Sequence, residues 1–176
     1  MPTTIAPDQE ALFAAITALI QLVVPIGTPI VRAIDNRVSM PLDGFVEMTP
    51  IYQQPLSTNV REYDDPGTPT GGTQNIRRPT EVQVQIDCYG PVSMSWATAI
   101  ETLWRDPIGC STLAPSCQPL FANQSRMIPL VNGEQQYEER WLVEAHLQYN
   151  PVTTVQQQFA GALAVNLINV DATYPP

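Results

Sequence analysis

The chain has 176 residues, of which 44% are hydrophobic and 14% charged, a composition typical of a globular protein with one core and not of a disordered chain. Its formal net charge is −9, and all eight basic residues are arginine. An acidic chain is not expected to hold nucleic acid by its phosphates, because that affinity comes from clustered cations. The 18 prolines, about twice the usual share, predict long irregular connections.

The N-terminal apolar stretch predicts a helix of the core over residues 8–24. Asp8 is placed to cap it, Glu10 lies in its first turn, and Pro25 and Gly27 end it. No basic residue precedes the apolar run, so it does not resemble a signal peptide. It is also shorter than the roughly 20 residues that cross a bilayer. We therefore expect no membrane association, and a cytoplasmic location in the cell that makes the protein.

Residues 30–34 and 45–49 have strand character and are expected to pair at the start of a sheet. From residue 50 to residue 80 the periodicity is lost, and the segment is rich in proline. Connections this long are usually functional or disordered. The sequence therefore leaves two interpretations open, a mobile surface loop or a long arm that orders against a neighbour. The candidate partner-contact residues of the arm are Tyr52 and Tyr63 as anchors, and Arg61, Arg77 and Arg78 as pairing groups.

Residues 81–89 alternate strictly between apolar and polar side chains, as expected for a central strand with one buried and one solvated face. Gly90 and Pro91 then break the strand, and Ser93 or Ser95 is expected to cap a helix. Residues 139–149 alternate in the same way and predict a second well-defined strand, which Pro151 ends. The predicted core residues are Val82, Val84, Ile86, Trp96, Trp104, Trp141 and Val143.

Two further regions complete the chain. Residues 106–133 are expected to be irregular, apart from a minor strand at 118–122. Residues 161–171 are mostly apolar at both odd and even positions, which predicts a strand covered on both faces, in the core or at a subunit contact. These elements predict an α+β fold: a mostly antiparallel central sheet of four to six strands, helices packed on one face, and a protruding loop or hairpin arm. Residues 1–176 are expected to form a single domain.

The sequence offers little support for catalysis or for a cofactor. His146, the single histidine, lies on the polar face of a predicted strand, where a hydrogen-bonded structural role is commoner than that of a general base. Serine-hydrolase, P-loop and zinc motifs are absent from the sequence. The three cysteines are too few and odd in number for a secreted disulfide framework. Cys88 is expected on a buried face, and Cys110 and Cys117 are either free or bonded to each other.

A set of segments taken together resembles the neck terminator or tail-terminator family of tailed bacteriophages. The segments are residues 31–50, 85–91, 95–97, 129–141 and 147–159, followed by VDATYP near the C-terminus. They cover most of the chain in one order, and none of them is a catalytic signature.

The resemblance implies a virion protein of the neck, assembled in the bacterial cytoplasm, with no enzymatic activity and no cofactor. Its implied partners are identical subunits in a ring, expected to be sixfold, together with the tail tube and the connector or neck proteins. DNA is expected to pass through the ring without specific binding, which suits an acidic chain. The alternatives are a head-tail connector adaptor or stopper, a monomeric ligand-binding or secreted module, and a hydrolase built on His146.

Overall fold

The structure is a computed structural model, and it describes residues 3–33, 41, 44–131 and 137–162. The described helices are α1 (Gln9–Gln21), α2 (Ser93–Trp104) and α3 (Pro107–Leu113). The described strands are β1 (Thr4–Ala6), β2 (Ile30–Arg32), β3 (Val46–Pro55), β4 (Val60–Asp64), β5 (Gly72–Arg77), β6 (Thr80–Tyr89), β7 (Gln118–Ala122), β8 (Arg126–Met127), β9 (Leu130–Val131), β10 (Tyr137–Glu138), β11 (Arg140–Tyr149) and β12 (Val152–Gln157).

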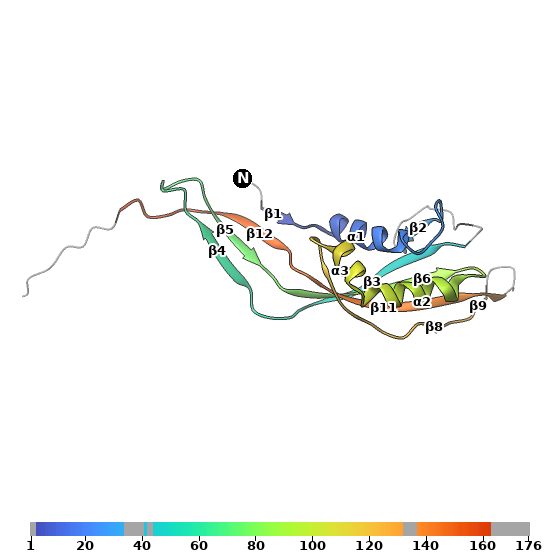
Figure 1. Ribbon diagram of the computed structural model, residues 1–176. Coiled ribbons are helices and arrows are strands. Elements are labelled where there is room, and N and C mark those ends of the chain that lie inside the picture. The colour runs from blue at the N-terminus through green and yellow to red at the C-terminus, as the bar shows by residue number, and fades with distance from the viewer. Residues whose placement is uncertain (1–2, 34–40, 42–43, 132–136, 163–176) are drawn as a thin grey trace, which may run out of the picture.

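The molecule consists of a body and an elongated arm (Figure 1). The body contains a six-stranded sheet with β2, β3, β6, β11 and β7 in that order and β8 paired beside β11. Its pairs are antiparallel except for β2 and β3, which run parallel. The arm is a four-stranded antiparallel sheet in the order β1, β12, β5 and β4. The predicted α+β class, the helices on one face of a mostly antiparallel sheet, and the arm are therefore confirmed.

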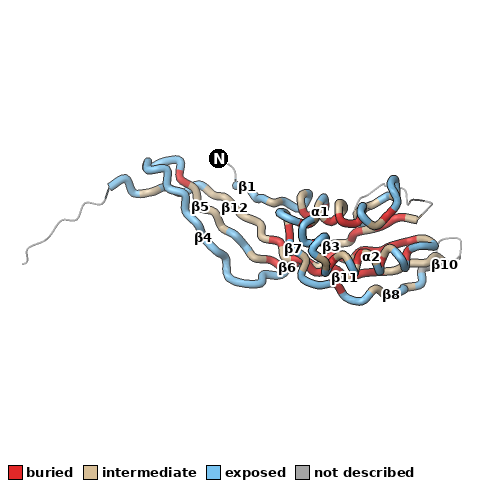
Figure 2. Tube along the Cα trace, in the orientation of Figure 1, coloured by how far each residue is buried: buried red, intermediate tan, exposed pale blue. Residues whose placement is uncertain are grey.

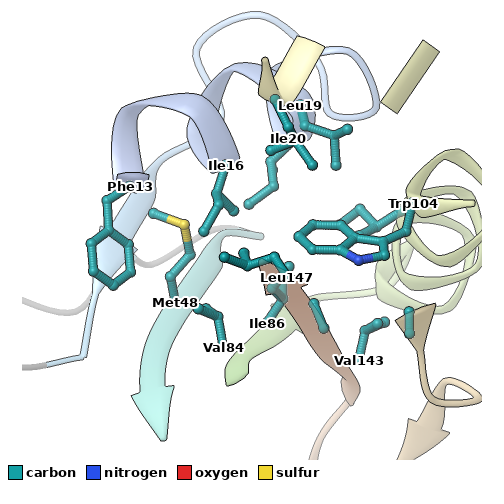
Figure 3. Packing of buried hydrophobic residues seen from close by; sticks show 14 of the residues in the cluster. Phe13, Ile16, Leu19, Ile20, Met48, Val84, Ile86, Trp104, Val143 and Leu147 are labelled. Atoms are coloured by element: carbon teal, nitrogen blue, oxygen red, sulfur yellow. The ribbon is translucent and has the colours of Figure 1, made fainter. Parts of the chain in front are cut away.

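The hydrophobic core lies in the body, between the central strands and the helices (Figure 3). Helix α1 contributes a buried stripe of Leu12, Phe13, Ile16, Leu19 and Ile20. This is the helical spacing expected of one apolar face. Helix α2 contributes Ile100 and Trp104, and the Trp104 indole N–H donates to the backbone oxygen of His146 at 3.1 Å. Trp104 therefore joins the helix layer to β11 through both packing and a buried hydrogen bond.

The predicted core residues lie in or beside this cluster. Val82, Val84, Ile86, Trp104 and Val143 are buried within it, whereas Trp96 and Trp141 are partly buried and pack against its margin. Burial is concentrated in the body, and most of the arm is exposed (Figure 2).

Besides the link from β1 to α1, three strand-to-strand passages connect the body to the arm, and each contains a proline. Pro55 ends β3, Pro79 separates β5 from β6, and Pro151 separates β11 from β12. Proline donates no backbone hydrogen bond, so each one interrupts a ladder. The strands remain joined there by two bonds, from the Leu56 N–H to the Pro79 carbonyl at 2.9 Å and from the Arg78 N–H to the Pro151 carbonyl at 3.0 Å. The prediction that Pro151 ends ladder pairing is confirmed, and the three prolines explain why the strands form two sheets.

Several sequence expectations are wrong in detail. Neither serine caps α2: its N-cap is Val92, which makes no side-chain cap bond, and Ser93 Oγ is buried without a partner. The minor strand expected at 118–122 is confirmed as β7, but the rest of residues 106–131 is not irregular, because it also contains α3, β8 and β9. Helix α3 starts at Pro107, and the Asp106 side chain accepts from the Ile108 N–H, a common N-terminal arrangement. Strand β12 was not predicted from sequence.

Other expectations concern the cysteines, the chain end and membranes. Cys110 and Cys117 are both free, so the bridge between them is excluded, and Cys88 is buried as expected. The strand predicted at 161–171 lies almost entirely outside the described residues. Among the described helices, none combines the length and apolar character that a membrane crossing requires.

Candidate interaction surfaces

The arm is a sheet without a hydrophobic core. Every residue of β4 is exposed, and β5 and β12 are half-buried or exposed apart from Gly72. The small buried site at Gly72 lies against the Phe159 ring, which a Cβ at this position would meet at 2.2 Å. An isolated sheet with both faces wet is only marginally stable in water. Among the described residues, the arm thus presents two open faces and an edge of β4 that no strand pairs with, the features that favour ordering against a partner.

Three of the five predicted contact residues lie on the arm. Tyr63 is exposed, its ring meets Phe159 edge-on at 6.5 Å between centroids, and its hydroxyl oxygen accepts from Gln74. Arg77 forms an exposed ion pair with Glu62 at 3.2 Å, a type of contact that contributes about 0 to 1 kcal/mol. Arg61 is exposed on β4. These side chains are therefore presented to solvent, with local contacts but little burial.

The other two, Tyr52 and Arg78, lie where the arm meets the body. They line a groove of about 550 Å³ together with residues of α1, β1, β3 and β12. Its lining residues are Ile5, Asp8, Gln9, Leu12, Phe13, Pro50, Ile51, Tyr52, Gln53, Arg78, Val82, Tyr149, Pro151 and Thr153. The structure therefore separates the five predicted residues into three on the arm and two in this junction groove.

A β-bulge shapes the wall of the junction groove. Pro50 pairs with Val84 and Tyr52 pairs with Gln83, so Ile51 is an extra residue in β3. Bulges redirect side chains and often lie beside functional sites. Strand β2 pairs with β3 only as far as Met48, and beyond that point no described strand pairs with this same edge of β3, whose opposite edge is paired with β6. The groove thus combines apolar side chains with a free strand edge.

The sheet face opposite the helices carries a polar cluster at Glu81. The Glu81 carboxylate accepts from Gln54 at 3.0 Å and from the Tyr52 hydroxyl at 3.3 Å, and His146 Nδ1 lies 2.7 Å from its Oε1. The Gln54 bond, followed by the His146 bond, lowers the pKa of Glu81. Phe121 stacks on the His146 ring at 4.1 Å. His146 is thus buried and engaged by its neighbours, not solvated.

A second polar cluster lies on the same face at Asp87, which is completely buried. Arg140 Nε donates to Asp87 at 2.9 Å, and Gln85 donates to its other oxygen at 2.7 Å. The bond to Asp87 raises the pKa of Arg140. The Tyr89 hydroxyl donates to Glu47 at 3.1 Å. The expectation of a solvated polar face on β6 is therefore wrong at Glu81 and Asp87, where pairing with other side chains replaces water.

The arrangement gives no support to the hydrolase alternative. Burial raises the pKa of the Cys88 and Cys117 thiols to about 12, so neither is a ready thiolate nucleophile at neutral pH. Within the part of the chain that the structure describes, no group of three or more histidine, cysteine or acidic residues could hold a metal ion.

Sequence reasoning missed the groove residues Ile5, Ile51 and Gln53 and the stacked Phe121. The groove forms only when α1, β3 and β12 come together, so no short motif marks it. The Pro50–Ile51 dipeptide, at which the alternation of β3 fails, is the one local signal that could have indicated the bulge.

Comparisons with known proteins are consistent with this architecture. The sequence model of a family described as phage neck terminator protein matches residues 10–173. Among solved structures, a sheath/tube terminator of an extracellular contractile injection system (PVC, extended state) has a similar fold, with a TM-score of 0.50 and 12% sequence identity. The match covers 95% of this chain and 64% of that one, so the present chain spans less than two thirds of its neighbour's length. A comparison with curated proteins finds no match.

Proposed function

Because the chain belongs to the phage neck terminator family, we propose that it is a structural virion protein that forms a ring, caps the tail tube and joins it to the head-tail connector. The ring is expected to be sixfold and to leave a channel through which DNA passes without specific binding. Assembly takes place in the cytoplasm of the host bacterium. No catalytic step is assigned to the protein, in keeping with the structural role of the family.

The observation that carries this proposal is the coreless arm. A four-stranded sheet with two open faces and a free edge is suited to contact with other subunits, either through its side chains or by strand addition. A ring requires two different surfaces on each subunit, joined by a rotation that closes. The arm and the body supply such distinct surfaces.

The acidic charge supports the proposed channel. With a net charge of −9, a ring of identical subunits repels phosphate, and this lowers the affinity that would delay DNA in transit. Several arginines are already engaged by carboxylates: Arg32 by Glu10, Arg77 by Glu62, Arg126 by Glu144 and Arg140 by Asp87. These pairs reduce the positive charge that is available to nucleic acid.

The test is electron microscopy of purified protein and of tails from cells that express the whole tail gene cluster, with the chain carrying a small electron-dense label. The proposal expects a labelled ring at the neck end of the tail tube. A labelled ring that contacts portal-side proteins and not the tube would favour the adaptor or stopper alternative. Tails that lack the label, together with a chain that stays monomeric when tube protein is added, would refute the proposed function.

A further inference from the structure

An apolar turn projects from the C-terminal end of α1. The Thr28 N–H donates to the Pro25 carbonyl at 3.1 Å, and Gly27 has a φ of 92°, as in a type II turn with Ile26 at its second position. Ile26 is completely exposed, with a relative accessibility of 107%, and Leu22 nearby is more than half exposed. We call residues 22–28 the apolar turn. Pro25 and the Thr28 bond restrain the backbone of this turn, and glycine accepts the positive φ at position 27 without strain, so docking Ile26 costs little conformational entropy.

The junction groove lies at the opposite end of the same helix. Leu12, Phe13 and Val82 among its lining residues belong to the buried core, and Ile5 and Ile51 are exposed apolar residues. Asp8 and Gln9, at the N-terminus of α1, also line it. The 13 residues of α1 separate the turn from the groove by about 20 Å at 1.5 Å per residue. A subunit therefore cannot place its own apolar turn in its own groove.

The two ends of α1 also complement each other in charge. The last turn of α1 contains no basic residue, so the partial negative charge of its C-terminal carbonyls is not offset by a nearby cation of the helix. In the groove, Arg78 is exposed, and its guanidinium has no acceptor or ion-pair partner among the described residues. An arginine beside a helix C-terminus is a favourable arrangement. The groove thus offers both an apolar surface and a cation to the apolar turn.

We propose that the apolar turn of one subunit docks in the junction groove of the next copy of the chain, with Ile26 against the apolar lining and Arg78 at the C-terminal end of the neighbour's α1. The contact joins two different surfaces, head to tail, which is the class of interface that closes into rings. The inference rests on the proposed ring and specifies which surfaces form it.

The test is disulfide cross-linking in assembled tails. In a Cys110→Ser background, which removes the exposed native thiol, the chain carries Ile26→Cys and Ile51→Cys together. Oxidation is expected to give a ladder of covalent multimers that ends at the ring size, because each subunit contributes one thiol to each of two interfaces. Each single-cysteine variant serves as the matched control and should give no ladder.

A second measurement uses charge in place of cross-linking. Ile26→Asp is expected to reduce incorporation into tails at least tenfold without changing the melting temperature of the free protein, because the side chain has no core contact. The matched control is Ile108→Asp, at an exposed apolar position on α3, and it should be incorporated normally.

The outcomes separate this inference from the proposed function. Rings at the tube end that give no ladder, or a ladder that stops at dimers, would overturn the docking contact and leave the ring intact. Normal incorporation of Ile26→Asp would overturn it as well. If no ring contains the chain, the proposed function fails and the contact fails with it.

Discussion

Removing β4 and most of β5 from the arm should abolish assembly while leaving the body folded. The variant replaces residues 59–76, which hold β4 and most of β5, with a four-residue Gly-Ser linker. Arg78 is retained because it lines the junction groove. The deletion removes the exposed Arg61 and Tyr63 together with the edge strand β4, and leaves β12 paired with β1.

The expected stability change can be worked out from the burial pattern. None of the buried hydrophobic residues lies between 59 and 76, so the deletion forfeits little apolar burial. It does remove the pairing of β5 with β12. The hydrogen bonds of this pairing are open to solvent, so their net contribution to stability is small. Shortening the connection from 18 residues to four lowers the entropy cost of closing it by about 1.3 kcal/mol. These effects oppose each other, and we expect the free energy of unfolding to change by less than about 1.5 kcal/mol.

The assay combines chemical denaturation of the purified variant with its incorporation into tails. The reasoning expects a denaturation midpoint close to that of the intact chain and loss of the variant from tails. A matched control keeps the arm length and replaces only Thr58 and Gly67 with serine and asparagine, one exposed position next to the deleted segment and one exposed position within it. Destabilisation by more than about 3 kcal/mol would refute the view that the arm contributes little to the core. Normal incorporation of a well-folded deletion would refute its role as a contact surface.

Three further predictions concern the body. Trp104→Ala should lower the free energy of unfolding by about 3 to 5 kcal/mol because the ring is fully buried. Trp141→Ala, at the core margin, should lower it clearly less in the same denaturation assay. Equal losses for the two variants would contradict the packing. Asp87→Ala should lower the free energy of unfolding by about 3 to 5 kcal/mol, since it leaves a partly buried Arg140 unpaired. A free energy of unfolding within about 0.5 kcal/mol of wild type would argue against the buried pair. The pKa of Glu81 is lower in the folded protein than its ordinary value of 4.5. At pH values above the unfolded pKa, ionised Glu81 therefore stabilises the fold, and this contribution is lost as the pH falls through the folded pKa. Wild type should therefore lose stability more steeply than Glu81→Gln between about pH 5 and pH 3, and parallel pH profiles would contradict this.

The body was largely predictable from sequence, since burial imposes periodicity. Residues 81–89 and 139–149 alternate because one face of each strand meets the helices, and α1 shows the helical stripe that packs onto the same core. Where burial does not select side chains, the signal disappears. Strands β4, β5 and β12 have exposed or half-buried residues on both faces, so their composition is that of a loop.

The interaction surfaces were harder to predict for a related reason. The sequence predicts Tyr52 and Arg78 as contact residues of an arm, but their position in a groove depends on the bulge at Ile51 and on the approach of α1, both tertiary features. The sequence does not single out Ile26, because Pro25 and Gly27 predict only the end of a helix. The same residues that end α1 also hold an apolar side chain in solvent, and this second role becomes evident only when its exposure is known.

The division between body and arm has a consequence for when the arm becomes ordered. The core binds α1, α2 and the central strands into one unit, so the body can fold before it meets a partner. The arm buries almost no apolar area, and its local stability is therefore expected to lie near the low end of the range found within a protein. Contact with a neighbour would bury its open faces and offset the entropy cost of ordering it. Backbone amides of β4 and β5 should accordingly exchange with solvent deuterium far faster than those of β6 and β11 in the free protein, and become protected on assembly.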